Sequence, residues 1–458
     1  MERIESRPQN FKRNIRHQNP RIHSQMEKTY SHNKKTLPII LLTIFIDMLG
    51  IGILVPIMPL LLADPSSEFY LLGTATASMS GDGLNAVQNG YILLGFLNAT
   101  FPFMQFLAAP ILGQLSDKYG RKKILGISIF GTCLSYIGFA IAIYMKNIPL
   151  LFIARAVDGI TGGNISVAQA SIADITEPKH RAKNFGLIGA AFGLGFIIGP
   201  FLGGKLSDPS ISSYFNATTP FFVAAILSFI NVLSVTMIYR ETHPNRNNQL
   251  KVTVTQAFHN IKKAFGFKHI RTILTTNFLF QGGFTFFTSF FSVSLIDRFH
   301  FTQGNIGDYF AYVGLWAIIA QAVVLRLVVK KFKEYQIIMV TMITLPTFIA
   351  MNLLVTSPWQ LLLLAPIYSI SNGLSQANMS SLISRSAGTE IQGEILGINS
   401  SVSSLAMTIP TLLSGFIAAK LTPETPILVA AITIFVAWLV FVISFKRGKI
   451  YKPEWIKA

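Results

Sequence analysis

Charged residues are scarce in this sequence. Of its 458 residues, 13% are Asp, Glu, Lys or Arg, and 51% are hydrophobic. A soluble domain usually carries about 25% charged residues, so the composition predicts an integral membrane protein. The net charge of +18 could suggest a nucleic-acid partner, but the distribution of that charge along the chain argues against one.

Cysteine and intramembrane histidine are also lacking. Cys133 is the only cysteine, which excludes disulfide bonds within the chain and cysteine metal sites. All eight histidines fall in predicted tails, loops or span ends, so we expect neither a histidine metal site nor a histidine relay inside the membrane. No Ser/His/Asp set, HExxH pair or glycine-rich phosphate loop stands in its required context. We therefore predict a protein that is not an enzyme and has no metal and no cofactor.

Twelve apolar runs are long enough to cross a bilayer, which needs about 20 helical residues. A long basic segment divides these runs six and six, and the two sets show weak internal similarity. The sequence therefore predicts an all-α membrane protein with twelve transmembrane helices in two six-helix bundles, the architecture of transporters that rock two halves about a central site. The runs are 37–62, 88–112, 124–145, 149–173, 184–206, 219–240, 270–296, 305–329, 336–356, 359–382, 393–419 and 425–445.

Lysine and arginine are distributed unevenly between the two sides of these spans. With the N-terminus in the cytoplasm, all but five of the 38 Lys and Arg residues fall in cytoplasmic tails and loops, the exceptions being Arg155, Lys146, Lys205, Arg298 and Lys420. This bias predicts a multi-pass protein of the cytoplasmic (inner) membrane with both termini in the cytoplasm. We divide the chain into a disordered basic tail (1–36), a first bundle (37–240), a cytoplasmic linker (241–269), a second bundle (270–446) and a C-terminal tail (447–458).

The linker contains a short amphipathic pattern. Val254, Phe258, Ile261 and Phe265 repeat at i, i+4, i+7 and i+11. This spacing predicts an interfacial helix that lies on the cytoplasmic leaflet.

Only three ionisable residues lie well inside the apolar runs: Asp47, Arg155 and Asp158. A charged side chain in hydrocarbon costs at least about 2.5–3.5 kcal/mol, so each should be paired, hydrated or functional. Arg155 and Asp158 are three residues apart on one helix and can pair, which favours the charged form of Asp158. Asp47 has no cation near it in the sequence. The alternative for both acids is a hydrogen bond to another helix that serves packing alone.

A predicted cytoplasmic loop, residues 113–123, reads GQLSDKYGRKK. Gly113 permits close helix packing, Asp117 can accept a hydrogen bond from a helix N-terminus or pair with Arg121, and Gly120 allows a tight turn. This segment closely resembles the loop signature of the major facilitator superfamily. The resemblance implies that Asp117 and Arg121 latch the two halves in an outward-open state.

Further segments resemble the drug/proton antiporter branch of that superfamily, in particular the tetracycline/proton antiporters. IDMLGIGILVPIMPLLL begins at Ile46, RAVDGITGGN begins at Arg155, and ADITEPKHR adds Asp174 and Arg181 to the implied latch. GLGFIIGPFLGG resembles the antiporter motif, which implies a smooth, kinked surface for contact with the eighth span, formed by Gly195, Gly199, Pro200, Gly203 and Gly204.

The second half resembles the same branch, with NFLFQGGFTFFTSFF in its first span and QGEILGINSSVSSL at the start of its fifth. The resemblance thus covers nearly the whole chain after residue 36. The loop RLVVKKFKEY departs from the family pattern, because it keeps the positive charge but lacks the glycines and the acid of the first-half signature.

Polar amides and aromatic residues that interrupt the spans are the candidates for substrate contact. Aromatic cavities with few charges suit amphiphilic organic compounds. The candidates are Asn98, Gln105, Asn164, Gln169, Asn277, Gln281, Phe284, Trp316, Gln321, Asn372 and Gln376.

Antiport requires a carboxylate whose protonation alternates with substrate occupancy, and we expect Asp47 to be this carrier ahead of the Arg155–Asp158 pair. The resemblance implies a monomeric, proton-coupled exporter of small drug-like molecules that works by alternating access. Its expected partners are a small-molecule substrate, protons and membrane lipids, with no nucleic acid. Two alternatives are an exporter of an endogenous metabolite or siderophore, and a passive facilitator or importer whose carboxylates are structural. Proton flux during transport would separate antiport from passive movement.

Overall fold

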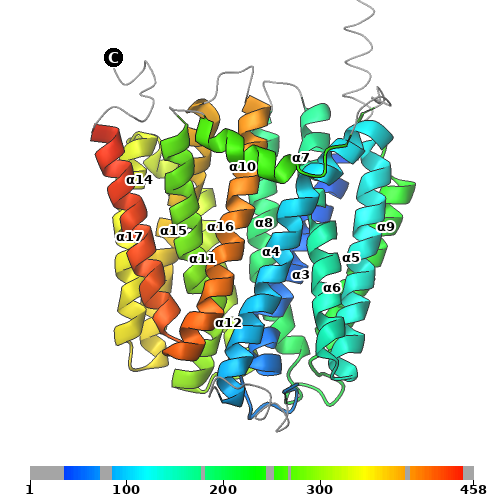
Figure 1. Cartoon of the computed structure of the whole chain (residues 1–458), viewed down its shortest axis with the longest axis vertical. Helices are drawn as coiled ribbons and strands as arrows, with labels where there is room; N and C mark the ends of the chain where they lie inside the picture. Colours follow the sequence, from blue (N-terminus) through cyan, green and yellow to red (C-terminus); the bar gives the residue numbers. More distant parts are fainter. Residues whose placement is uncertain are drawn as a thin grey trace, which may run out of the picture.

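A computed structural model describes residues 36–72, 85–176, 181–243, 252–266, 270–386 and 392–446. These segments form long helices that run side by side, with one short helix, α10 (Gln256–Gly266), lying across one end of the bundle (Figure 1). The described part of the chain starts and stops at the same end of the bundle as α10 (Figure 1). We call this end the linker end and the other the opposite end.

The first half of the chain forms six long helical stretches, of which the fourth is divided in two. They are α3 (Thr36–Leu62), α4 (Ala86–Tyr119), α5 (Arg121–Tyr144), α6 (Ile148–Gly162) with α7 (Asn164–Asp174), α8 (Arg181–Leu206) and α9 (Thr219–Met237). The predicted spans match these helices, except that α4 runs seven residues beyond the predicted end at residue 112 and carries the signature loop on its last turns.

The second half repeats the pattern after α10. It comprises α11 (Arg271–Phe299), α12 (Gln303–Ile319), the π-helical turn η3 (Ala320–Val324), α13 (Leu325–Val328), α14 (Glu334–Met351), the 3₁₀ turn η4 (Asn352–Leu354), α15 (Pro358–Ser386), α16 (Gln392–Lys420) and α17 (Thr425–Lys446). The structure shows no strand within the described ranges.

Within the described residues, eleven helical stretches are long and apolar enough to cross a membrane when α6 and α7 are taken as one. The twelfth predicted span corresponds to α15, which has 29 residues but a less apolar sequence that includes several serines and asparagines. The helical fold with two six-helix halves is confirmed, and the chain is a multi-pass membrane protein.

Local sequence explains where several helices begin and end. The Asn85 side chain accepts from the Gln88 backbone N–H while the Gln88 side chain caps Asn85 in return, so α4 starts on a capping box. Thr302 and Asn305 form the same device before α12. Gly120 separates α4 from α5 with φ = 100°, a conformation that strongly favours glycine.

The two halves meet closely at the opposite end. A β-carbon added to Gly95 of α4 would lie 2.9 Å from the Cα of Gly415 on α16, and one added to Gly204 of α8 would lie 3.0 Å from the Cα of Gly307 on α12. Beside the second contact, Lys205 Nζ pairs with Asp308 Oδ2 at 2.8 Å. Glycines at both crossings let the helix backbones touch, so the two halves are in direct contact at this end.

Candidate functional site

Arg155 and Asp158 form a buried ion pair on α6. Arg155 Nη1 and Asp158 Oδ2 are 3.0 Å apart, and the two residues are only 6% and 3% exposed. Their three-residue spacing puts them on one face of the helix, in the contact that the sequence predicts. The Arg155 guanidinium also lies over the Phe101 ring of α4, with 4.7 Å from Cζ to the ring centroid. The charge of Asp158 therefore has a nearby partner.

Asp47 is buried on α3 without such a partner. It is 5% exposed, and its Oδ2 accepts no hydrogen bond from any described residue. Gly50, one turn further, leaves room for Tyr136 of α5, because a β-carbon there would lie 1.5 Å from Tyr136 Oη. The Asn164 amide and the Asp158 carboxylate are polar groups that lie near the Asp47 carboxylate. The two acids and this amide thus belong to one polar cluster inside the first half.

The fourth span is broken beside Asp47, where the sequence predicted one continuous helix. The break lies at Gly163, which approaches α4 so closely that a β-carbon would be 2.9 Å from the Ala109 nitrogen. Side chains satisfy the carbonyl groups that the break releases: Gln105 Nε2 donates to Gly162 O at 3.0 Å, and Ser166 Oγ donates to Gly163 O at 2.8 Å. The break therefore coincides with the close approach of α4 and with these two side-chain hydrogen bonds.

Asn164 opens the second segment of this broken span, α7. It is 0% exposed and its amide lies beside Asp47, but neither Oδ1 nor Nδ2 is within hydrogen-bonding geometry of a described residue. Buried polar atoms without partners are uncommon and cost about 1–3 kcal/mol each. Asp47 Oδ2 and both Asn164 amide atoms therefore form a site that can still accept and donate hydrogen bonds to a proton carrier, water or solute.

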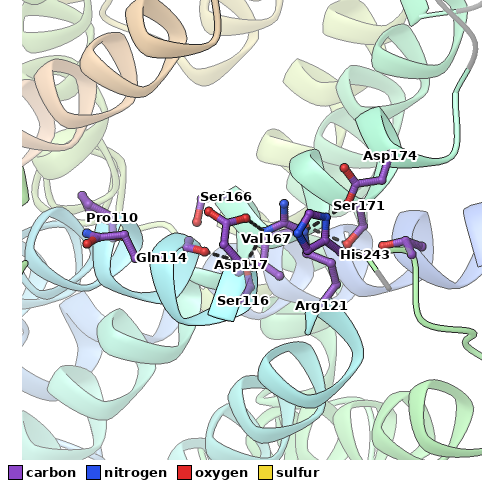
Figure 2. Close-up of polar contacts among 12 residues, drawn as sticks. Pro110, Gln114, Ser116, Asp117, Arg121, Ser166, Val167, Ser171, Asp174 and His243 are labelled. Atoms are coloured by element: carbon purple, nitrogen blue, oxygen red, sulfur yellow. Dashed lines mark hydrogen bonds and ion pairs between the residues drawn. The ribbon is translucent and has the colours of Figure 1, made fainter. Parts of the chain in front are cut away.

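Arg121 is the centre of a second polar cluster, at the linker end (Figure 2). Its Nη1 pairs with Asp117 Oδ1 at 2.6 Å, and its Nε pairs with Asp174 Oδ2 at 3.1 Å. The Ser116 hydroxyl also accepts from Arg121. Within the described ranges, these ion pairs and hydrogen bonds join α4, α5 and α7 of the first half and do not reach the second half.

The remaining residues of the implied latch take different places. Gly113 lies near Ser166, whose Oγ would be 3.9 Å from an added β-carbon. The side chain of Arg181 lies outside the described residues, although its backbone begins α8.

Glu241 is part of this linker-end cluster, and the sequence did not single it out. Its carboxylate accepts from the backbone N–H of Arg121 at 2.9 Å and of Lys122 at 3.3 Å. Gly120 has no side chain with which to cap α5, so an acid from the segment after α9 takes that role and places negative charge at the positive end of the helix. An acidic residue 120 positions away has no local sequence signal that would identify it as a cap.

The second half carries an ion pair at a corresponding place, with the charges exchanged. Glu334, the first residue of α14, pairs with Arg385 near the end of α15, with 3.3 Å between Arg385 Nε and Glu334 Oε1. Ser381 Oγ donates to the same oxygen at 2.9 Å. In the first half, the cation Arg121 is the first residue of α5 and the anion Asp174 ends α7. The loop before Glu334 lacks the family signature, which is why the sequence showed no counterpart there.

The glycines of the antiporter motif differ from the expected arrangement. Gly195, Gly199 and Gly203 face α3 rather than α12, with added β-carbons 2.5 Å from Met48 Cβ, Leu49 O and Ile53 O respectively. Their four-residue spacing keeps all three on one face of α8.

The next part of the motif does face α12. A β-carbon at Gly204 would be 2.4 Å from Gln303 O, and one at Gly307 would be 2.8 Å from Pro200 O. The expected contact with the eighth span is therefore made by a different face of α8 from the one that meets α3, because a one-residue step from Gly203 turns the helix by about 100°. In the middle of the motif, Ile197 belongs to this contact, since a β-carbon at Gly314 of α12 would lie 2.0 Å from Ile197 Cγ1.

The candidate substrate residues are dispersed. Gln105 is engaged at the helix break, and Asn277 Nδ2 donates to Asn399 Oδ1 at 2.9 Å between α11 and α16. Trp316 Nε1 is buried without a partner in the described part of the chain. Gln321 lies across the boundary between the halves, since its Oε1 would be 3.4 Å from a β-carbon at Gly189 of α8. The other candidates are Asn98, Gln281, Phe284 and Asn372, which are half-buried, and Gln169 and Gln376, which are exposed.

Comparison with known proteins makes this chain, with its two helical halves, a membrane transporter and not an enzyme. A family model described as Major Facilitator Superfamily matches residues 40–411. The chain belongs to this superfamily.

Three relatives are 28–32% identical to this chain over the residues that align. It is similar to the class H tetracycline resistance protein of Pasteurella multocida, with 32% identity over 384 residues that cover 84% of this chain and 89% of the relative. The class C tetracycline resistance protein of Escherichia coli is 29% identical, covering 85% and 91%. Multidrug resistance protein 1 of Bacillus subtilis (strain 168) is 28% identical, covering 83% and 89%.

Solved structures share the fold. The human organic anion transporter MFSD10 (TETRAN) matches with a TM-score of 0.68 and 20% identity, covering 89% of this chain and 99% of that one. An inward-open conformation of the xylose transporter XylE from E. coli matches with a TM-score of 0.67 and 15% identity, covering 88% and 95%.

Proposed function

We propose that this protein is a proton-coupled antiporter that exports small amphiphilic organic molecules across the cytoplasmic membrane. Membership of the superfamily makes it a transporter, and the names of its relatives as tetracycline and multidrug resistance proteins favour drug-like substrates. Proton coupling rests on the chain's own residues. The observation that supports it is that Asp47 is buried and has no cationic partner among the described residues.

Asp47 suits a proton carrier because, of the two acids buried in the described part of the chain, it is the one that lacks a cationic partner. In a site shielded from water, its charged form is costly, whereas its protonated form can remain buried. Asp158 is paired with Arg155, which stabilises its charge and fixes its position. In the proposed cycle, Asp47 loses its proton when the cavity opens to the cytoplasm and substrate loads. It is protonated again on the other side, where substrate leaves.

The orientation proposed from the sequence makes the linker end cytoplasmic. The glycine crossings and the Lys205–Asp308 pair then close the extracellular side, so that substrate would load from the cytoplasm. Alternating access would separate these glycine surfaces and bring the linker ends of the two halves together. We propose that the Arg121 cluster and the Glu334–Arg385 pair stabilise the linker ends during that exchange.

For the substrate, we propose a path between the halves that passes the broken fourth span and α12. Gln321 faces α8 of the other half, and the unpartnered Trp316 Nε1 lies about one turn away on the same helix. A polar amide with aromatic surface nearby suits a flat amphiphile that is oriented by few hydrogen bonds. Asn164 would provide the polar contact from the first half.

The test is substrate-driven proton movement by purified protein in proteoliposomes, measured with a pH-sensitive dye. Wild-type protein should couple tetracycline or a cationic dye to proton flux. Asp47→Asn should still bind and exchange substrate, but it should not drive uphill export from a pH gradient, because the amide cannot release a proton. Asp158→Asn is the matched control, since it removes the charge of the paired acid. Full coupling in Asp47→Asn, with loss in Asp158→Asn, would transfer the carrier role to Asp158. Transport by wild type without proton flux would indicate a passive facilitator.

A further inference from the structure

The linker segment is attached to both halves of the protein. On the first half, Gln114 of α4 makes two hydrogen bonds to the Thr253 backbone, with 2.8 Å from Thr253 N to Gln114 Oε1 and 3.3 Å from Gln114 Nε2 to Thr253 O. On the second half, Asn260 Nδ2 donates to Ser401 Oγ of α16 at 3.1 Å. The Phe258 ring also meets the Phe106 ring of α4 edge to face, with 5.5 Å between centroids. The segment that contains α10 thus bridges the halves at the linker end, as its position across α4, α16 and α11 shows (Figure 1).

The face of α10 that contacts the bundle is made of small residues. Ala257, Asn260 and Ala264 are 0%, 8% and 5% exposed and repeat at i, i+3 and i+7. The apolar stripe predicted from the sequence is turned away from this contact at its beginning, where Val254 is 69% and Phe258 58% exposed.

The rest of the stripe differs from its beginning. Ile261 is partly buried against the core of the second half, and the side chain of Phe265 lies outside the described residues. Val254 therefore points outward, and Phe258 packs against Phe106 of α4 while more than half of its surface stays exposed, at the level where the helices of the bundle end.

The charge around these residues is positive. Lys262 and Lys263 are exposed on the next turn of α10. Residues 244–271 contain no Asp or Glu, whereas they contain six Lys and Arg residues in all. A short helix that lies across the ends of membrane spans, with outward apolar side chains and adjacent lysines, matches the boundary between acyl chains and anionic headgroups.

We propose that α10 is a lipid-binding strap: Val254 and Phe258 enter the acyl boundary, while Lys262 and Lys263 bind the phosphates of anionic lipids. Because the same segment is bonded to α4 and α16, the bound lipid also stabilises the bridge between the two halves. Each lysine near an anionic surface strengthens the attachment about fivefold. The strap does not depend on the identity of the exported substrate or on proton coupling.

The test uses full-length protein in nanodiscs, with an environment-sensitive fluorophore on Val254→Cys in a Cys133→Ser background. We expect quenching by brominated acyl chains and little quenching by aqueous iodide. The emission of the label should also shift to the blue as phosphatidylglycerol is added to phosphatidylcholine. The phosphatidylglycerol fraction that gives half of this shift should be several-fold lower than in the Lys262→Gln/Lys263→Gln variant. Tyr214 is 86% exposed in a loop at the opposite end, and Ile226 is 60% exposed within a span. Labels on Tyr214→Cys and Ile226→Cys therefore give the aqueous and lipid references.

The matched charge control is Lys330→Gln/Lys331→Gln, which removes the same charge from another loop at the linker end. It should leave the phosphatidylglycerol response of the Val254 label unchanged, and an equal loss in this control would reduce the effect to general surface charge. A label quenched by iodide alone would overturn the proposal, as would a label shielded from both quenchers, which would mean that protein covers this face. Inorganic phosphate with phosphatidylcholine discs should not reproduce the shift, and a full shift there would show that the site binds free anions instead of lipid.

Discussion

Replacing Gly199 by alanine should destabilise the protein, whereas the same replacement at Gly193 should not. A β-carbon at Gly199 would lie 2.5 Å from Leu49 O and 2.8 Å from Gly52 Cα. Both are backbone atoms of α3, so no side-chain rotation can relieve the overlap and α3 must move away from α8. At Gly193, on the same helix, an added β-carbon has no neighbouring atom within 4 Å.

The size of the contrast follows from two terms. Alanine favours a helix over glycine by about 1 kcal/mol, and this gain is common to both variants. Overpacking at Gly199 costs about 1–3 kcal/mol, so the variants should differ by that amount. Each kcal/mol lost from the free energy of unfolding lowers the unfolding temperature by about 2–4 °C for a domain the size of one six-helix half.

The single cysteine provides the assay. Cys133 is 5% exposed in α5, and its Sγ donates to Ala225 O at 3.3 Å. A thiol-reactive fluorogenic dye should therefore label the folded protein slowly and report unfolding on heating in detergent. Equal midpoints for Gly193→Ala and Gly199→Ala would refute the close α3–α8 contact and the motif geometry built on it.

Three further outcomes are expected. Arg155→Ala leaves Asp158 buried without its partner, which costs about 3–5 kcal/mol. This variant should therefore give a lower yield of folded protein in size-exclusion chromatography. A normal yield would contradict the buried pair. Glu334→Arg and Arg385→Glu should each reduce transport, while the double exchange should restore it; failure of the exchange to rescue would mean that the contact has no role as a pair. A reporter active only in the cytoplasm should work at the C-terminus and be silent within 66–83, and activity at that loop would reverse the orientation.

The sequence was sufficient for the spans because apolar length is local information. Every predicted run corresponds to a helical stretch in the structure, and the Arg155–Asp158 contact follows from three-residue spacing on one helix. Two features of the sequence distinguished Asp47 from Asp158. Asp47 lies deep in its apolar run and has no cation near it, whereas Asp158 is three residues from Arg155.

The contacts between helices could not be obtained in this way. Spacing shows that Gly195 and Gly199 share a face of α8, but it does not show that α3 covers this face. The break at Gly163 coincides with the close approach of α4, and the cap that Glu241 provides depends on a residue distant in the chain. The pair between Glu334 and Arg385 was missed for a different reason, because the loop before Glu334 lacks the family signature.

The π-helical turn η3, which lies between α12 and α13, has a consequence for the number of residues in the eighth span. A π turn holds one residue more than an α turn, so Ala320–Val324 has the effect of a one-residue insertion in an otherwise regular helix. Everything after Val324 is rotated by about 100° relative to an uninterrupted helix. Members of the superfamily that have a straight helix here should therefore be one residue shorter between the positions of Trp316 and Arg326.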